Sequence, residues 1–400
     1  MQGTAGSSTG VVGADSGDTD GNDDPMPTPP PAASSSSSGP SPGPDTGDDT
    51  GTDESTGEGS SSDGRLPLCE DPTWWSRWWR HRTRVTIDSR GVTDALGNFP
   101  MLVRLNDERV DYSETQDTGA DIRIVSEDGK LVLSHEIELW DESGSSDLWV
   151  RFPEVPAEGS PSPVFYIYFG NDTAPNTSAP AEVWSNAYTS VHHMGTMVDS
   201  TLTGHDGQPN GGVASGPGLV GLTSIFDGDN DFIAVPSESD YDYTDDMTLE
   251  TLIRVDAFDT SFQAIVTKGD SAWRLHRDNN SDYAAFANTN RIIGTDSTVA
   301  ETSINTGAWH TVAMSLGNNR KRVFIDGVLI QDESFNASMA TSSDLVMFGE
   351  NAQATQRYFE GAIDEVRLSP ARRSANWLRT SHRAMRDLGM LQYEPPTSCP

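Results

Sequence analysis

Positive charge is scarce in this chain of 400 residues. Lys and Arg together number 26 against 61 Asp and Glu, which gives a formal net charge of −35 at pH 7. The only lysines are Lys130, Lys268 and Lys321. Nucleic-acid binding depends on cations that neutralise phosphates, so the charge argues against a nucleic-acid partner. We interpret the acidity as a solvated surface that keeps the protein soluble, and a salt-rich habitat is the alternative.

Long apolar runs are also missing. No stretch of about 18 apolar residues occurs, so we expect no transmembrane span. The chain starts with MQGTAGSSTGVVG, without the basic start and apolar core of an export signal. Either the protein is cytoplasmic or its true start lies upstream. We favour an upstream start because of the composition of residues 1–64.

Aromatic residues are absent from residues 1–64, and aliphatic ones nearly so, while Ser, Gly, Pro, Thr and Asp recur. Such a segment cannot bury enough apolar surface to offset chain entropy, so we predict a disordered linker over residues 1–68. In composition it resembles the stalk of a bacterial surface lipoprotein. We therefore expect an extracellular or cell-surface location, with a lipid anchor at the outer membrane or in the periplasm as one version.

Cysteine occurs twice, as Cys69 just after the linker and Cys399 at the penultimate position. This placement predicts a disulfide that closes nearly the whole folded chain. Loop-entropy arithmetic gives an upper bound of about 5–6 kcal/mol for its stabilisation. The alternative is two free thiols, because disulfides require an oxidising compartment.

Residues 69–180 read as a first β-sandwich domain. Alternating strands follow one another at short spacing, and prolines lie in the gaps between them, where they suit strand ends and loops. Four tryptophans precede the first strand in DPTWWSRWWRHRTRVTI. Their flat rings suit sugar stacking, but we favour a packing role in which they plug one end of the sandwich.

The stretch SHEIELWDE places Glu136 and Glu138 on the same strand face. Paired carboxylates on alternate strand positions are typical of retaining glycosidases with a jelly-roll fold. The third acid is out of step, because those sites follow E-x-D-x-x-E, whereas Asp141 completes a different pattern here. We therefore interpret the stretch as a solvated strand face and name no catalytic residue.

The blocks from WWSRWWRHRTRVTIDS through LSHEIELWDESGSSDLWVRFP to VFYIYFGN resemble, in their order, a bacterial domain of unknown function that commonly precedes laminin-G-like modules on surface proteins. The resemblance covers about Trp74 to Asn171. It implies an all-β fold and leaves the function open.

Residues 181–370 form the second predicted domain. It opens with VHHMG and DSTLTGHDGQPNG, whose histidines lack the ligand spacing of a zinc site, so we expect His193 to be a packed histidine. Strands are predicted at 247–255, 263–268, 273–276, 283–287, 309–316, 322–329 with a turn at 326–327, 345–348 and 361–368. Such regular spacing indicates a sandwich or jelly roll.

Six blocks in order, MTLETLIRV, AIVTKGD, AWRLH, GAWHTVAMS, KRVFIDGVLI and FEGAIDEVRLS, resemble the laminin-G-like, concanavalin A-like jelly roll. The resemblance implies two curved antiparallel sheets and a binding role. We predict that the last block, with Ile363 and Glu365 on one face and Asp364 and Val366 on the other, lies beside FDGDNDFIAV. Residues 371–400 are predicted as a short helix capped by Ser374 and a C-terminal tail.

Related jelly rolls hold a structural calcium ion with an aspartate of the closing strand, and the matching residue is Asp364. Calcium takes hard oxygen ligands in flexible geometry, and Asp227, Asp229 or the carbonyl of Gly228 are candidate partners. The alternative is an Asp364 that is held by backbone donors or by an arginine.

A ligand, if one exists, is expected on a face that bears Arg274, His276, Tyr283 and Arg291. Strand alternation places Trp273 and Leu275 in the core and turns Arg274 and His276 outward. The expected function is extracellular binding or adhesion, by a monomer, to a polysaccharide or a cell-surface glycan or protein, more favoured than catalysis. A glycoside hydrolase and a structural spacer are the alternatives.

Overall fold

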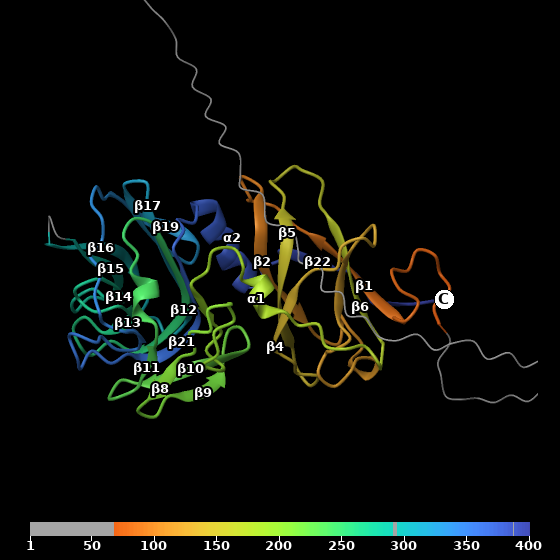
Figure 1. Cartoon of the computed structure of the whole chain (residues 1–400), viewed down its shortest axis with the longest axis horizontal. Coiled ribbons are helices and arrows are strands. Elements are labelled where there is room, and N and C mark those ends of the chain that lie inside the picture. Colours follow the sequence, from red (N-terminus) through yellow and green to blue (C-terminus); the bar gives the residue numbers. More distant parts are fainter. Residues whose placement is uncertain (1–67, 291–293, 387) are drawn as a thin grey trace, which may run out of the picture. The chain divides into compact units, whose positions relative to one another are not determined.

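Antiparallel strands dominate the computed structural model, which describes residues 68–290, 294–386 and 388–400 (Figure 1). The predicted disordered linker, apart from residue 68, lies outside the described residues. The all-β prediction is confirmed. Within the described part of the chain, no helix is long and apolar enough to cross a membrane.

The first sandwich, called the first unit below, comprises described residues 68–183 and the chain end from Ser374, and it contains two sheets. One has the order β22-β1-β6-β3, with β23 also paired to β1; the bounds are β1 His81–Ile87, β3 Arg123–Ser126, β6 Val164–Phe169, β22 Leu391–Tyr393 and β23 Thr397–Ser398. The other has the order β2-β5-β4; the bounds are β2 Leu96–Leu105, β4 His135–Leu139 and β5 Ser146–Val155. A helix α1 (Pro180–Val183) follows, and 3-10 turns span Tyr112–Glu114 and Glu238–Tyr241.

The end of the chain returns to the first unit. Helix α2 (Ala375–Met385) is capped by Ser374, whose hydroxyl accepts a hydrogen bond from the Trp377 amide, as predicted. Trp377 and Met385 pack in the same apolar cluster as Phe99 of β2. Beyond the helix, β22 and β23 pair with β1, and a disulfide joins Cys69 to Cys399. The end of the chain therefore adds a helix and two strands to the first sandwich, and α2 also contacts the second sandwich, since His382 bonds to Thr311 and Arg386 to the Trp309 carbonyl.

The tryptophan-rich start of the first unit is partly a packing element. Trp74 and Trp79 are buried and form a small cluster with Tyr168 of β6, and their indole nitrogens donate to the carbonyls of Trp79 and Asp121. Trp78 is 46% exposed. The packing interpretation therefore holds for Trp74 and Trp79.

The second unit packs an eight-stranded sheet on a seven-stranded one. The first has the order β19-β18-β17-β12-β21-β10-β9, with β7 paired to β21; the bounds are β7 Ser190–His192, β9 Ala214–Pro217, β10 Leu222–Asp227, β12 Met247–Ala257, β17 Trp309–Gly317, β18 Arg320–Ile325, β19 Val328–Ser334 and β21 Glu360–Ser369. The second has the order β16-β15-β14-β13-β20-β11-β8; the bounds are β8 Gln208–Asn210, β11 Phe232–Val235, β13 Ala264–Thr267, β14 Trp273–Arg277, β15 Tyr283–Asn290, β16 Gly294–Ser303 and β20 Val346–Phe348.

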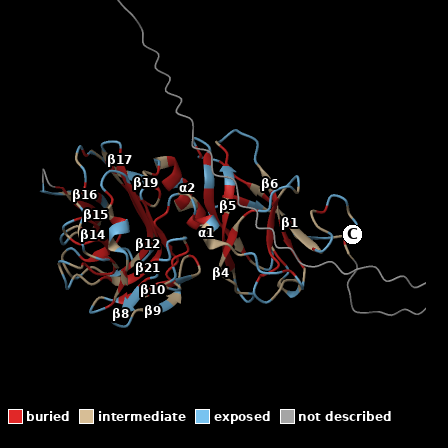
Figure 2. Ribbon diagram, viewed as in Figure 1, coloured by how far each residue is buried: buried red, intermediate tan, exposed pale blue. Residues whose placement is uncertain are grey.

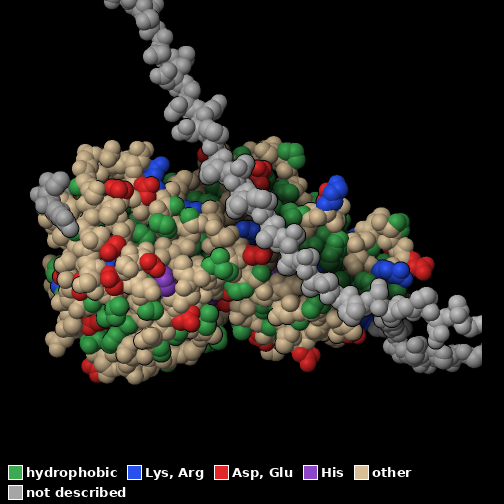
Figure 3. All heavy atoms as spheres, in the orientation of Figure 1, with side chains coloured by type: hydrophobic (Ala, Val, Ile, Leu, Met, Phe, Trp, Pro, Cys, Tyr) green, Lys and Arg blue, Asp and Glu red, His purple; other side chains and the backbone are tan. Residues whose placement is uncertain are grey.

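Strand β21 is central to its sheet. It pairs with β12 on one edge and with β10 and β7 on the other, so the first and last strands lie side by side as predicted. Figure 2 shows β12 and β21 buried over most of their length. Asp and Glu side chains are dispersed over the face visible in Figure 3, as a solvated acidic surface requires.

The predicted alternation along β21 is wrong for two residues, Glu365 and Val366. The register to β12 shifts so that Glu365 and Val366 together face the single residue Thr251, and Glu365 has a φ of 52°. This is a β-bulge whose first residue is left-handed, a position that glycine usually takes. Ile363 and Val366 both reach the sandwich core, and Glu365 turns away from it.

Candidate functional site

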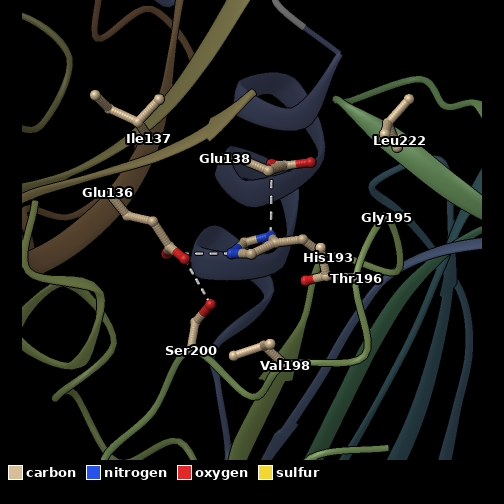
Figure 4. Close-up of a pocket in the computed structure, with 9 residues that line it drawn as sticks. All are labelled: Glu136, Ile137, Glu138, His193, Gly195, Thr196, Val198, Ser200 and Leu222. Atoms are coloured by element: carbon tan, nitrogen blue, oxygen red, sulfur yellow. Dashed lines mark hydrogen bonds and ion pairs between the residues drawn. The ribbon is translucent and has the colours of Figure 1, made fainter. Parts of the chain in front are cut away.

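A cavity of about 270 Å³ lies where the two units meet (Figure 4). Strand β4 contributes Glu136 and Glu138, and the segment after β7 contributes His193 and Ser200. The remaining lining residues are Ile137, Gly195, Thr196, Val198 and Leu222. Val198 and Leu222 are partly exposed, at 56% and 39%, so apolar surface stands at the rim while charge lies deeper.

His193 is the centre of this site. Its Nδ1 atom lies 2.6 Å from Oε1 of Glu365 and 3.5 Å from Oε2 of Glu138. Its Nε2 atom lies 3.2 Å from Oε2 of Glu136. One imidazole therefore meets three carboxylates, two from the first unit and one from the second. Figure 4 shows the ring between Glu136 and Glu138.

The two glutamates of β4 share a face, as strand alternation predicted, but the solvated face expected for them is wrong. Glu136 is 8% exposed, and the Glu138 side chain is 6% exposed. The reason is that the second unit covers this face of β4. Such burial demands partners for each carboxylate, because an unpaired buried charge is costly.

Tryptophan indoles and a hydroxyl supply part of those partners. Trp184 Nε1 donates to Glu136 Oε2 at 2.6 Å, and Ser200 Oγ donates to Glu136 Oε1 at 2.6 Å. Trp149 Nε1 donates to Glu138 Oε2 at 2.7 Å. The Trp149 ring also stacks on the His193 ring, with centroids 5.9 Å apart and planes 14° apart. Both carboxylate oxygens of Glu136 therefore accept hydrogen bonds.

Arg367 completes the site from the second unit. Its guanidinium donates to Oε2 of Glu365 through Nε at 3.1 Å and Nη2 at 2.5 Å. It also lies over the rings of Trp149 and Trp184, at 4.2 and 4.8 Å from their centroids. The bulge at Glu365 is what presents this carboxylate to both His193 and Arg367.

These contacts lower the pKa values of two buried acids and leave those of two others raised. Burial opposes ionisation of Glu365, but the charges of His193 and Arg367 outweigh it and lower its pKa to about 2. Burial likewise opposes ionisation of Glu136, yet His193 and the hydrogen bonds lower its pKa. Burial raises the pKa of Glu138 well above its usual value, and burial with the charge of Glu365 does the same for the pKa of Asp364.

At His193, burial and the neighbouring charges shift the pKa in opposite directions, and the charges prevail. Burial alone would lower its pKa, but the three carboxylates raise it well above its usual value, so the site favours the charged form of the ring. The surroundings therefore favour the ionised forms of Glu136 and Glu365 beside His193 and Arg367, whereas burial favours the neutral forms of Glu138 and Asp364. Within the described part of the chain, Glu138 Oε1 and Asp364 Oδ1 are buried without a hydrogen-bond partner.

Three of these residues have the geometry of metal ligands. One ligand atom each from Glu138, His193 and Glu365 lies within 4.8 Å of the others. An imidazole with two carboxylates suits a borderline divalent ion such as zinc, which would compete with protons for these three groups. Sequence spacing did not indicate this group, because its members come from β4, the segment after β7 and β21.

The residues predicted to hold calcium are not brought together. The register places Asp227 opposite Glu360 and Ser224 opposite Ile363, so Asp364 lies four positions, about 13 Å, further along the sheet. Asp227 accepts from the backbone amides of Asp229 and Asn230 in a turn. Asp364 is fully buried, and its Oδ2 accepts from the Val220 amide at 3.3 Å. Calcium binding stays a prediction.

The predicted ligand face is covered. Alternation on β14 holds, since Trp273 and Leu275 are in the core, but Arg274 and His276 are only 8% and 4% exposed, so their expected exposure is wrong. The ring of Phe262 packs on His276, and the Arg274 guanidinium bonds to the carbonyl and the carboxylate of Asp270. Burial lowers the pKa of His276 to about 4. Tyr283 is half-buried, and Arg291 lies outside the described residues.

Sequence reasoning singled out Glu136, Glu138 and His193 but gave each a structural role of its own. It missed Ser200, Arg367 and the two supporting tryptophans. The available signals were the alternating glutamates Glu136 and Glu138 in β4 and the adjacent acids of β21, Asp364 and Glu365. Neither signal shows that β4 and β21 lie close together.

Comparisons with known proteins agree with this architecture. Residues 227–379 match the concanavalin A-like lectin/glucanases superfamily. Residues 118–194 match a domain of unknown function (DUF2341). The predicted order of the two families is therefore confirmed. A search of curated proteins finds no match.

Solved structures with distant similarity include domain 4 of AbnA, an extracellular arabinanase from Geobacillus stearothermophilus, in complex with arabinotriose. It has 17% identity and a TM-score of 0.40 over 48% of this chain and 97% of that domain. The binding domain of Paraclostridial Mosquitocidal Protein 1 has 12% identity and a TM-score of 0.43 over 49% of this chain and 51% of its own. The binding domain of botulinum neurotoxin serotype G has 15% identity and a TM-score of 0.41, and half of it is covered.

Proposed function

We propose that this chain is an extracellular or cell-surface carbohydrate-binding protein and that its ligand enters the cavity at Glu136, His193 and Ser200. The observation that carries the proposal is the lining itself: ionised and hydroxyl groups lie deep, and the exposed aliphatic side chains of Val198 and Leu222 stand at the rim. Sugars present hydroxyl donors beside apolar C–H faces, which this combination matches.

Two further observations support the proposal. Residues 227–379 match a superfamily that is described by its lectins and glucanases. The disulfide between Cys69 and Cys399 suits an oxidising compartment such as the cell exterior. Adhesion to a surface polymer follows if the ligand is part of a cell wall or a neighbouring cell.

Glycoside hydrolysis is the second candidate, and one observation favours it. Glu136 and Glu138 lie on one strand in one cavity, and their pKa values shift in opposite directions, as an acid and a base of a glycosidase require. Both oxygens of Glu136 already accept strong hydrogen bonds, however. A carboxylate so engaged is a poor nucleophile, so binding ranks above hydrolysis.

A glycan array with a blocked cavity tests the proposal. Arginine at both rim positions, V198R with L222R, fills the entrance at partly exposed sites and leaves the buried network intact. The matched control is L202R, because Leu202 is 86% exposed in the same segment and does not line the cavity. We expect the double variant to lose glycan binding and the control to keep it.

The other outcomes separate the alternatives. Binding that survives the rim variant places the ligand elsewhere and overturns the proposed site. No binding by the wild type to any glycan favours a structural spacer. Release of reducing sugar from a polysaccharide panel by the wild type, lost in Glu136→Gln, establishes a hydrolase instead.

A further inference from the structure

A second buried charged group lies inside the second sandwich, between its two sheets. Lys321 belongs to β18 of the eight-stranded sheet, whereas Asn288 of β15 and Asp296 of β16 face each other as a pair in the seven-stranded sheet. Lys321 and Asn288 have no exposed surface. A lysine amine therefore reaches from one sheet to a carboxamide of the other, away from water.

The amine has few partners, and one is a carboxamide. Nζ of Lys321 lies 2.8 Å from Oδ2 of Asp296, 3.1 Å from Oδ1 of Asn288 and 3.3 Å from the Asp296 carbonyl. The rings of Phe286 and Phe335 lie 5.7 and 5.5 Å from Nζ. Nδ2 of Asn288 is buried and has no hydrogen-bond partner among the residues that the structure describes. Such an unsatisfied group in a core requires an explanation.

Lys268 of the same sandwich provides the contrast. It is equally buried, but its amine contacts the carboxylates of Glu238 and Asp242, at 2.9 and 3.1 Å, and the carbonyls of Ser342 and Asp344, at 2.6 and 3.2 Å. No side-chain amide takes part. Lys268 is an ordinary buried ion pair, whereas Lys321 has an acid and an amide side by side.

We propose that Lys321 and Asn288 form an isopeptide bond that ties the two sheets together, with Asp296 as the proton carrier. The requirements of the reaction are a nucleophilic amine and a carboxamide in contact with each other and shielded from water, with a base beside them. Lys321 and Asn288 are fully buried, and Asp296, whose side chain is 30% exposed, supplies the base. The unpartnered Nδ2 of Asn288 is then the leaving group.

The reaction balances without any co-reactant. The Asp296 carboxylate takes a proton from the Lys321 ammonium, and the free amine attacks Cγ of Asn288. Asp296 then passes this proton to Nδ2, the bond from Cγ to Nδ2 breaks, and ammonia leaves. Nζ gives up its second proton as the amide forms, first to the Asp296 carboxylate and then to the departing ammonia, so the products are the amide and an ammonium ion. Burial lowers the pKa of Lys321, which eases the first step.

Tryptic peptide mapping of the full-length protein tests the proposal. Cleavage after Arg277 and Arg291 releases peptide 278–291, and cleavage after Arg320 and Arg322 releases the dipeptide Lys321-Arg322. We expect a branched species that contains both and lacks the mass of one ammonia. Intact mass alone is insufficient, because cyclisation of Gln2 or of Asn210 before Gly211 also loses ammonia.

Variants identify the reacting groups. Asp296→Asn removes the base at nearly constant size, and Lys321→Arg replaces the amine by a guanidinium that stays protonated. Both are expected to release peptide 278–291 unbranched. Lys268→Arg is the matched control and is expected to keep the branch. Wild-type protein that yields only the free, unmodified peptide 278–291 overturns the proposal, whatever the variants do, as does a branch that survives Lys321→Arg.

Discussion

Two glutamates that lie two residues apart on β4 are expected to respond in opposite ways to the same substitution. Glu136→Gln removes an ionised carboxylate that faces His193 and accepts from Trp184 and Ser200. The amide has one acceptor in place of two, so one of those donors meets an NH₂ group. Breaking a buried ion pair on one side costs about 3–5 kcal/mol, which is the expected loss in the free energy of unfolding.

Glu138→Gln is expected to change stability by less than about 1 kcal/mol at low pH, because a protonated glutamic acid and a glutamine are nearly isosteric and the amide oxygen still accepts from Trp149. The direction in which this stability difference changes with pH follows from the pKa of Glu138. Because the folded-state pKa of Glu138 is raised above its ordinary value of 4.5, the wild type loses stability as pH rises from there. The variant does not, so its advantage should grow with pH.

Urea unfolding, followed by tryptophan fluorescence at pH about 5 and about 8, measures both effects. Glu154→Gln is the matched control, since Glu154 is exposed on β5 and should give no change. Equal losses for Glu136→Gln and Glu138→Gln would refute the division of the site into ionised and protonated acids. A Glu138→Gln advantage that shrinks with rising pH would also refute it.

Four other predictions concern the rest of the chain. Replacing Cys69 and Cys399 by serine should lower the free energy of unfolding by at most about 5–6 kcal/mol, and a non-reducing peptide map that finds free thiols in exported protein would contradict the pairing. Calcium bound at Asp364 should make the melting temperature fall with a chelator, and no response to chelator or added calcium argues against a site. Removing residues 1–64 should leave the melting transition unchanged, whereas a clear loss of stability would show that they support the fold. Arg274→Ala should reduce stability without selectively abolishing glycan binding, because the side chain is buried; selective loss on a glycan array would restore the ligand face first predicted.

Much of the fold could be predicted because strand alternation and turn residues are local signals. The hairpin at Asp326 and Gly327 is one case, where both residues take positive φ angles of 51° and 72° as the turn chemistry requires. Strand β16 was missed for the same reason, since GTDSTVAETS offers little apolar alternation. Its side chains are placed by pairing with β15, which a local pattern does not report.

The site could not be predicted as a unit. Its members come from stretches that are far apart in the sequence, and the bulge at Glu365 reverses the face that simple alternation assigns to this residue. The exposure of Glu136, Arg274 and His276 was misjudged because a single strand does not show what packs over it. Burial by a neighbouring unit or loop is a tertiary property, and polar residue type is a poor guide to it.

The return of the chain end to β1 has a consequence for biosynthesis. The first sandwich is discontinuous in sequence, and the second is inserted between its two parts, since β22, β23 and α2 all follow β21. A nascent chain can therefore complete the inserted domain while its host still lacks two strands, a helix and Cys399. Folding of the host must wait for the last thirty or so residues, and a product truncated after β21 should contain one closed sandwich and one open one.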